Sequence, residues 1–208
     1  SPEVNNKKIK VYILSGLSQD KPEDVMRGEE TQLAGYFMDN PNFSGSICLP
    51  GTHSKWVNVK NYHILNFNTF LTGELFEILK NNSVLKHSLL TEEISEKKLI
   101  EGVEIILKNP NNLSYLLFQL RAKDLLKNQS SIDANSLLSG YFLGLELLGS
   151  KNYWYKKDVV LIGSEFLTKY YELCLQKKVN SIKKFNSSEM TLKGLSYFKN
   201  NLNLSKLM

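Results

Sequence analysis

The sequence predicts an α/β fold with a mixed sheet and helices, in which a three-stranded meander precedes alternating helices and strands. Short apolar or β-branched segments separated by tight turns indicate the meander, at "SICLP" (46–50), "KWVNV" (55–59) and "HILNFNTF" (63–70). Two later segments, "DVVLIGS" (158–164) and "KVNSIKKF" (178–185), each lead into an apolar repeat of helical spacing. The chain has 208 residues, 42% of them hydrophobic, which is enough to bury a core.

Ahead of the meander, the sequence predicts one strand and one helix. Residues 8–16, "KIKVYILSG", alternate and are β-branched, which is typical of a strand, and the polar residues 17–24 predict a loop. Residues 25–38, "VMRGEETQLAGYFM", predict a loop that leads into a helix. The apolar positions that indicate this helix are Met26, Leu33 and Phe37.

The middle of the chain is predicted to be helical. The segments with helical apolar spacing are 73–82, 95–109, 112–126 and 133–149. The first of these follows Thr72, which we place in the N-cap region. Gly140 and Gly144 lie four residues apart in the last segment, and this spacing predicts close helix packing in a core. Acidic residues bound that segment, which is too short to span a membrane.

The last third is predicted to alternate strand, helix, strand and helix, with the helices at 165–176 and 187–202. From Ser46 onward, the order of three strands, helices and then two strand–helix pairs is that of one lobe of a ribonuclease-H-like, actin-like domain. We therefore expect residues 1–40 to be the C-terminal β-α remnant of a first lobe. Residues 41–208 are then expected to form the second lobe.

Charge and cysteine content argue against several classes of partner. The net charge is +5, from 26 basic and 21 acidic residues, and the basic runs are short, so we expect no nucleic-acid partner. Cys48 and Cys174 lie in apolar surroundings without zinc-site spacing, so they are expected to be small buried residues. With no signal peptide and no long apolar span, we expect a cytoplasmic protein without a membrane partner.

The stretch "RGEE" (27–30) places an Arg and two carboxylates around a glycine, at the expected start of a helix. Glutamates in the first helical turn are favoured by the helix dipole, so stabilisation of the helix is one explanation. The other explanation is that Glu29 or Glu30 takes part in acid–base chemistry or metal binding.

The stretch "PGTHSKWV" (50–57) places several groups that are able to bind an anion in a turn between two strands. A glycine lets the backbone approach a ligand closely, and consecutive amides of such a turn form an anion-binding concavity. An ordinary polar β-turn is the alternative explanation, in which Lys55 simply begins the next strand as a solvated side chain.

These two stretches, together with "FLTGEL" (70–75), "LFQLRAKDLL" (117–126) and "LIGSEFLTKYY" (161–171), resemble the 2-dehydro-3-deoxygalactonokinase family. The resemblance covers nearly the whole chain. It implies membership of the sugar kinase and actin superfamily, and an ATP-dependent transferase of carbohydrate metabolism. The implied reaction converts 2-dehydro-3-deoxy-D-galactonate to its 6-phosphate with ATP and Mg²⁺.

The Asp-x-Gly phosphate loop that the family carries in its first lobe does not occur in this sequence. The alternative is therefore a stand-alone, non-catalytic lobe that binds a nucleotide or a partner. Either a missing N-terminal lobe or a second copy of the chain would cover the surface where the first lobe docks.

The resemblance also implies roles for individual residues. Glu29 matches the catalytic base that accepts the proton of the sugar hydroxyl. Substrate binding is expected of Arg27, Glu30 and Thr72. Nucleotide and phosphate binding is expected of Gly51, Thr52, His53, Ser54, Lys55, Gly163 and Ser164. No metal ligand is assigned to the chain itself.

Overall fold

The computed structural model describes residues 3–4, 7–8 and 12–201, and a five-stranded mixed sheet forms its centre. The strand order is β7-β6-β5-β8-β9. The strands are β5 (Gly45–Leu49), β6 (Ser54–Lys60), β7 (His63–Phe70), β8 (Asp158–Gly163) and β9 (Ser181–Asn186). Strands β5, β6 and β7 form an antiparallel meander, whereas β8 runs parallel to β5 and to β9. The predicted α/β class with a mixed sheet is confirmed, and so is the meander.

The helices also follow the predicted order. They are α1 (Glu29–Asp39), α2 (Thr72–Asn82), α3 (Glu96–Lys108), α4 (Leu113–Lys127), α5 (Ser131–Gly149), α6 (Lys151–Trp154), α7 (Glu165–Leu175) and α8 (Ser187–Asn201). The short helix α6 and two short 3-10 helices, Val84–His87 and Pro110–Asn112, were not predicted. The prediction of an N-cap at Thr72 is wrong, because α2 begins at Thr72 itself and Leu71 holds the cap position without a side-chain bond.

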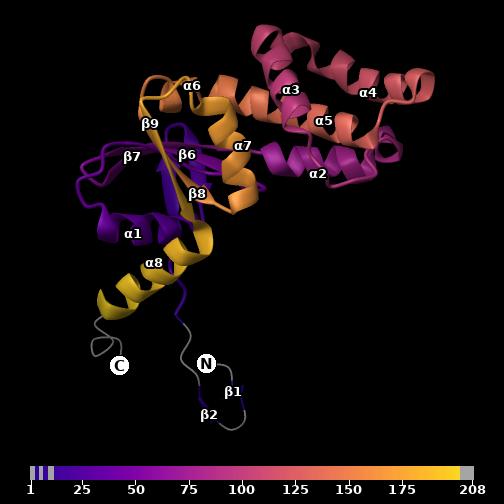
Figure 1. Cartoon of the computed structure of the whole chain (residues 1–208). Helices are drawn as coiled ribbons and strands as arrows, with labels where there is room; N and C mark the ends of the chain where they lie inside the picture. The colour runs from indigo at the N-terminus through magenta and orange to yellow at the C-terminus, as the bar shows by residue number, and fades with distance from the viewer. Residues whose placement is uncertain (1–2, 5–6, 9–11, 202–208) are drawn as a thin grey trace.

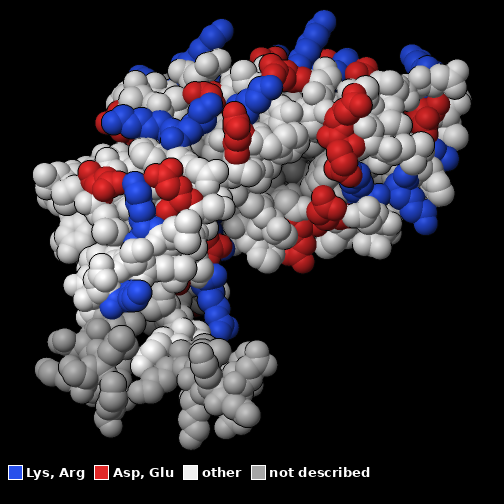
Figure 2. All heavy atoms as spheres, turned by 60° about the horizontal axis from the view of Figure 1, so that its bottom comes forward, with Lys and Arg blue, Asp and Glu red and all other residues white. Residues whose placement is uncertain are grey.

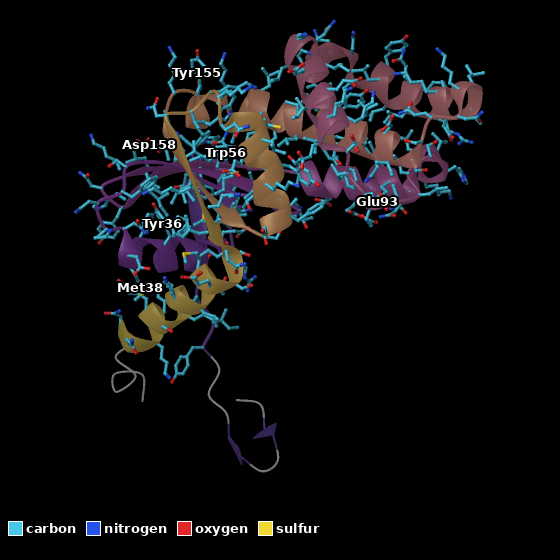
Figure 3. The ribbon with its side chains drawn as sticks, in the orientation of Figure 1. Tyr36, Met38, Trp56, Glu93, Tyr155 and Asp158 are labelled. Carbon is cyan, nitrogen blue, oxygen red and sulfur yellow. The ribbon has the colours of Figure 1, made fainter. Side chains whose placement is uncertain are left out.

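The sheet separates two hydrophobic clusters. Helices α1 and α8 cover one face, α5 to α7 lie on the other, and α2 to α5 extend away as a helical part (Figure 1). Side chains of β6 alternate between the faces, because successive residues of a strand point to opposite sides. Trp56 packs with Leu147 and Tyr171 on the α5–α7 side, whereas Val57 packs with Tyr36 on the α1 side. Figure 3 labels Trp56 and Tyr36.

Close helix packing at glycine is confirmed. A Cβ on Gly140 of α5 would collide with the carbonyl oxygen of Leu99 on α3, and one on Gly144 would lie 3.0 Å from the Ile106 side chain. A glycine also allows α1 and α8 to pack closely, because a Cβ on Gly194 would collide with the Thr31 carbonyl oxygen. Both pairs of helices therefore approach backbone to backbone.

Predictions for the first part of the chain are partly wrong. Residues 17–24 were expected to be a loop, but β3 (Leu17–Asp20) and β4 (Glu23–Met26) form an antiparallel hairpin. Of the strand expected at 8–16, Lys8 belongs to β2 (Lys7–Lys8), which pairs with β1 (Glu3–Val4). Residues 12–16 are in no strand, and residues 9–11 lie outside the described residues.

The β3–β4 hairpin is attached to the sheet by polar side chains and by Met26 at the end of β4, which is buried in the core on the α1 side. Asp24 accepts hydrogen bonds from the Thr69 backbone nitrogen and hydroxyl, both at 2.7 Å. The Gln19 amide bonds both backbone groups of Phe67, at 3.0 and 3.2 Å. Because its strands lack apolar alternation, the hairpin gave no strand signal in the sequence.

Helix α1 belongs to the same hydrophobic core as the sheet. Leu33 and Tyr36 pack with Ile47 and Val57, and this packing continues to Met190 of α8. The division of the chain near residue 40 stays a prediction. No helix among the described residues combines the length and apolar character needed to cross a membrane.

Candidate functional site

A cavity of about 600 Å³ opens where β5 and β8 end and where α1 and α7 begin. Ligands of open α/β sheets bind at this position, outside the carboxyl ends of parallel strands. We call it the polar cavity; its lining residues are Arg27, Gly28, Glu29, Gln32, Leu49, Pro50, Gly51, Thr52, His53, Ile162, Gly163, Ser164, Leu167, Ser187 and Thr191. The structure thus brings together most of the residues singled out in the sequence, from three separate motifs.

Glu29 begins α1 at the edge of this cavity. Its Oε1 lies 3.1 Å from the Lys55 ammonium, and its Oε2 accepts a hydrogen bond from the Arg27 backbone nitrogen at 3.0 Å. Gly28 precedes it with a φ of 110°, a conformation that residues with a Cβ rarely adopt. The Glu29 side chain keeps 24% of its surface exposed, so the carboxylate is held on both oxygens and still reaches the cavity.

Glu30 faces inward instead. Its Oε2 accepts from the Gly28 backbone nitrogen at 2.6 Å, and its Oε1 accepts from the Thr31 hydroxyl at 3.3 Å. The side chain is buried and is absent from the cavity lining. The geometry therefore favours stabilisation of the helix start by Glu30, and it leaves Glu29 as the carboxylate that faces the cavity.

The turn after β5 is braced by the start of α2. The Thr52 carbonyl accepts a hydrogen bond from the Glu74 backbone nitrogen at 3.0 Å, and His53 Nε2 lies 2.6 Å from a Glu74 carboxylate oxygen. A Cβ on Gly73 would lie only 2.7 Å from the Gly51 carbonyl oxygen. Glycine at position 73 therefore permits the close approach of α2, while a Cβ on Gly51 would meet nothing within 4 Å.

The last two residues of the predicted phosphate turn are buried. Ser54 and Lys55 begin β6 and point to opposite faces of the sheet, and neither lines the polar cavity. The Ser54 hydroxyl bonds the Tyr171 hydroxyl at 3.0 Å, and Lys55 pairs with Glu29. The structure does not bring these two side chains to the cavity with Gly51 and Thr52.

Glu146 of α5 is an acidic residue that sequence reasoning missed. It is 2% exposed and lies on the opposite face of the sheet from Glu29. Its Oε1 accepts from Trp56 Nε1 at 2.8 Å, and its Oε2 accepts from the Tyr171 hydroxyl at 2.8 Å and from the Thr72 hydroxyl. A single carboxylate inside the apolar helix segment "GLELLG" was the available signal.

Among the described contacts of the Glu146 carboxylate, every hydrogen-bond donor is a neutral group. Burial raises the pKa of Glu146 above its ordinary value of 4.5, and hydrogen bonds from Thr72, Trp56, Tyr171 and Ser54 oppose that shift. Burial, followed by the neighbouring Glu146 charge, raises the pKa of Tyr171 well above its usual range. The hydrogen bonds of Glu146 therefore link β6, α2, α5 and α7 to one another.

A second cavity of about 290 Å³ lies between the sheet and the helical part, and its lining is mainly apolar. We call it the apolar cavity; its lining residues are Gly51, Thr52, Thr72, Gly73, Phe76, Glu77, Glu92, Ile94, Leu99, Asn135, Ser139, Phe142, Leu143, Phe166, Leu167, Tyr170 and Tyr171. Thr72, expected at the sugar site, lines this cavity and not the polar one. Gly51, Thr52 and Leu167 line both cavities, so the two are neighbours across the turn.

The described residues contain no group of three or more His, Cys, Asp or Glu side chains that would hold a metal ion. Glu29 is the single carboxylate in the polar-cavity lining. Mg²⁺ in phosphoryl-transfer sites takes one or two carboxylates and completes its shell with phosphate oxygens and water. The lining therefore fits a magnesium ion that arrives bound to a polyphosphate.

Other expectations concern cysteines and surface charge. Cys48 and Cys174 are free and buried, as predicted. On the face drawn in Figure 2, basic and acidic side chains are interspersed, and the surface is hollowed near the middle of the view.

The chain was compared with known proteins. A family model described as 2-keto-3-deoxy-galactonokinase matches residues 2–198. A Rhizobium meliloti (strain 1021) protein named "Probable 2-dehydro-3-deoxygalactonokinase DgoK1" is 35% identical over an alignment of 192 residues that covers 89% of this chain and 63% of the relative. The 2-dehydro-3-deoxygalactonokinase of Escherichia coli (strain K12) is 34% identical over 169 residues, or 80% of this chain and 57% of the relative.

Among solved structures, a candidate 2-dehydro-3-deoxygalactonokinase from Sinorhizobium meliloti superimposes with a TM-score of 0.82 at 34% identity. The superposition covers 90% of this chain and 65% of that one. The chain thus spans less than two thirds of the length of the relatives to which it is similar.

Proposed function

The chain belongs to the 2-keto-3-deoxy-galactonokinase family, and we propose that it forms part of an ATP-dependent kinase acting on 2-dehydro-3-deoxy-D-galactonate. The product is the 6-phosphate. The observation that carries the proposal is the polar cavity, which unites Glu29 with the Gly51–Thr52 turn and the Gly163–Ser164 turn. A non-catalytic binding lobe is less favoured, because both curated relatives are named as kinases.

The proposed fold is a ribonuclease-H-like lobe of the actin type. Its support is the sheet order β7-β6-β5-β8-β9, in which β6 alone runs against the other strands. Because the chain spans 63% and 57% of the curated relatives, the remaining length of such a kinase supplies the other wall of the active site. The first phosphate loop is proposed to lie in that wall.

In the proposed complex, the nucleotide crosses the turn between the two cavities. The phosphates lie in the polar cavity against the amides of Gly51 and Thr52 and the Thr52 hydroxyl, with His53 beside them. The base enters the apolar cavity, which shares the same turn. Ser164 caps α7 by accepting from the Leu167 backbone nitrogen at 3.3 Å, so the positive end of that helix dipole faces the phosphates.

The sugar acid is proposed to lie against α1. Glu29 accepts the proton of the attacking hydroxyl, and the Arg27 guanidinium, at the cavity edge, pairs with the sugar carboxylate. Magnesium, when bound with ATP, would neutralise charge on the phosphates and take its ligands mainly from phosphate oxygens and water. Positioning and charge neutralisation carry most of the catalysis in phosphoryl transfer.

Nucleotide binding by this chain tests the phosphate turn directly. Isothermal titration with Mg-ATP and with ADP is expected to show binding that Thr52→Ala weakens by about tenfold, the effect of about 1.4 kcal/mol. Ser114→Ala, on the exposed side of α4, is the matched control and is expected to bind like the wild type. Binding that is equal in the wild type and in Thr52→Ala would contradict the role of the turn.

A further inference from the structure

Lys55 is a buried ammonium group with one described anionic partner. Its side chain is 5% exposed, and its Nζ lies 3.1 Å from Oε1 of Glu29. Burying a charge is costly unless an opposite charge and hydrogen bonds compensate. The ion pair to Glu29 is therefore the condition under which a lysine is tolerated at this position.

The direction of the Lys55 side chain separates it from the phosphate turn. It points to the face of β6 that carries Val57 and Val59 and that α1 covers. It is absent from the linings of both the polar and the apolar cavity. Lys55 therefore does not line the cavity in which a phosphate against Gly51 and Thr52 would lie, whereas its partner Glu29 does.

Glu29 is fixed from two sides by this arrangement. Lys55 holds Oε1 while the Arg27 backbone nitrogen holds Oε2. A glutamate at the start of a helix otherwise has three rotatable side-chain bonds, and an unrestrained base spends little time in line with the proton it accepts. The two contacts restrict that freedom, while the Glu29 side chain stays 24% exposed and lines the polar cavity.

We propose that Lys55 is a positioning residue for Glu29 in phosphoryl transfer and not a phosphate ligand, an inference that rests on the proposed function. The Glu29 carboxylate takes the proton of the sugar hydroxyl as the oxygen bonds the γ-phosphorus and the bond to the β-phosphate oxygen breaks, which releases ADP. The proton on Glu29 returns to solvent after product release.

Steady-state kinetics of the full-length gene product that contains this chain test the assignment. Lys55→Met is expected to lower kcat by on the order of 10- to 100-fold, because the base loses its fixed orientation. The KM for ATP is expected to change by less than about twofold, since an interaction that acts on the transition state lowers kcat without uniform loss of binding. The matched control is Lys184→Met, which removes an exposed ion pair to Glu172.

Two further variants keep the test decisive if Lys55→Met fails to fold. Lys55→Arg retains the charge. It is expected to lower kcat by less than Lys55→Met does and to leave the KM for ATP unchanged. Lys55→Met combined with Glu29→Gln is expected to be no slower than Glu29→Gln alone, because both changes act on one group.

The outcomes separate this inference from the proposed function. A wild-type protein that transfers no phosphate to the sugar acid overturns the proposed function, and the Lys55 role with it. An active wild type whose Lys55 variants raise the KM for ATP and keep kcat overturns the positioning role alone and makes Lys55 a phosphate ligand. A double variant whose loss in kcat equals the combined losses of Lys55→Met and Glu29→Gln also overturns the positioning role.

Discussion

Two acidic side chains, Glu29 and Glu146, lie on opposite faces of strand β6 and are held in opposite ways. Lys55 points to Glu29 on the α1 side, whereas the next residue, Trp56, points to Glu146 on the α5–α7 side. Glu29 has a cationic partner and an open side toward the polar cavity. Glu146 is closed off, and only neutral donors bond it among its described contacts.

The two carboxylates differ in whether a ligand is able to reach them. A carboxylate with its lone pairs open to a cavity is able to accept a proton from a ligand. A carboxylate whose oxygens are all engaged by Trp56, Thr72 and Tyr171 instead organises the elements that carry those donors. Because strand residues alternate in direction, two successive positions of β6 reach both groups.

The largest expected effect is the loss of stability on removing Glu146. Glu146→Ala leaves the Trp56, Thr72 and Tyr171 donors without their acceptor and opens a cavity, so the free energy of unfolding is expected to fall by about 3–5 kcal/mol. Urea unfolding measures it. Glu104→Ala, an exposed change on α3, is the control. A fall of less than about 1 kcal/mol for Glu146→Ala would remove the organising role given to Glu146.

A smaller effect is expected in the pH dependence of stability. Burial raises the pKa of Glu146 in the folded state above the ordinary value of 4.5. The folded state therefore binds the proton more tightly than the unfolded state. The stabilisation of the folded state by this tighter proton binding is fully present below pH 4.5. It is lost as the pH rises through the pKa of Glu146 in the folded state.

Glu146→Gln, which keeps the shape and does not titrate, isolates this contribution. The free energy of unfolding of the wild type, minus that of Glu146→Gln, is expected to decrease as the pH rises above 4.5, by at most about 1.4 kcal/mol per pH unit. Urea unfolding of both proteins at a series of pH values measures the difference. Parallel curves would show that Glu146 is as easily ionised as an exposed glutamate.

The sequence predicted the parts of the fold that follow from local patterns. The meander, the two later strands and the glycine contacts of α5 come from alternation, helical spacing and small residues, which act over a few positions. The β3–β4 hairpin was missed because Asp24 and Gln19 attach it through side-chain bonds to β7, a contact between distant segments.

The site was predictable only in outline. The polar turn and the "RGEE" stretch were identified, and the structure brings them to one cavity. Which of two adjacent residues faces the cavity was not predictable, since Glu29 and Glu30 are chemically alike and differ by one step around α1. The partner of Trp56 was equally hidden, because Glu146 lies 90 residues away in the chain.

The most direct test of the account is the rate of ATP-dependent phosphorylation of 2-dehydro-3-deoxy-D-galactonate by the full-length gene product and by its Glu29→Gln variant. The wild type is expected to phosphorylate the 6-position of the sugar acid. In Glu29→Gln, we expect kcat to fall by about 10²- to 10⁴-fold, the usual contribution of a general base. The rate is measured per folded molecule, because this variant also leaves the buried Lys55 ammonium without its anionic partner. Equal rates in the two proteins, or transfer by the variant alone, would contradict the assignment of Glu29 as the base.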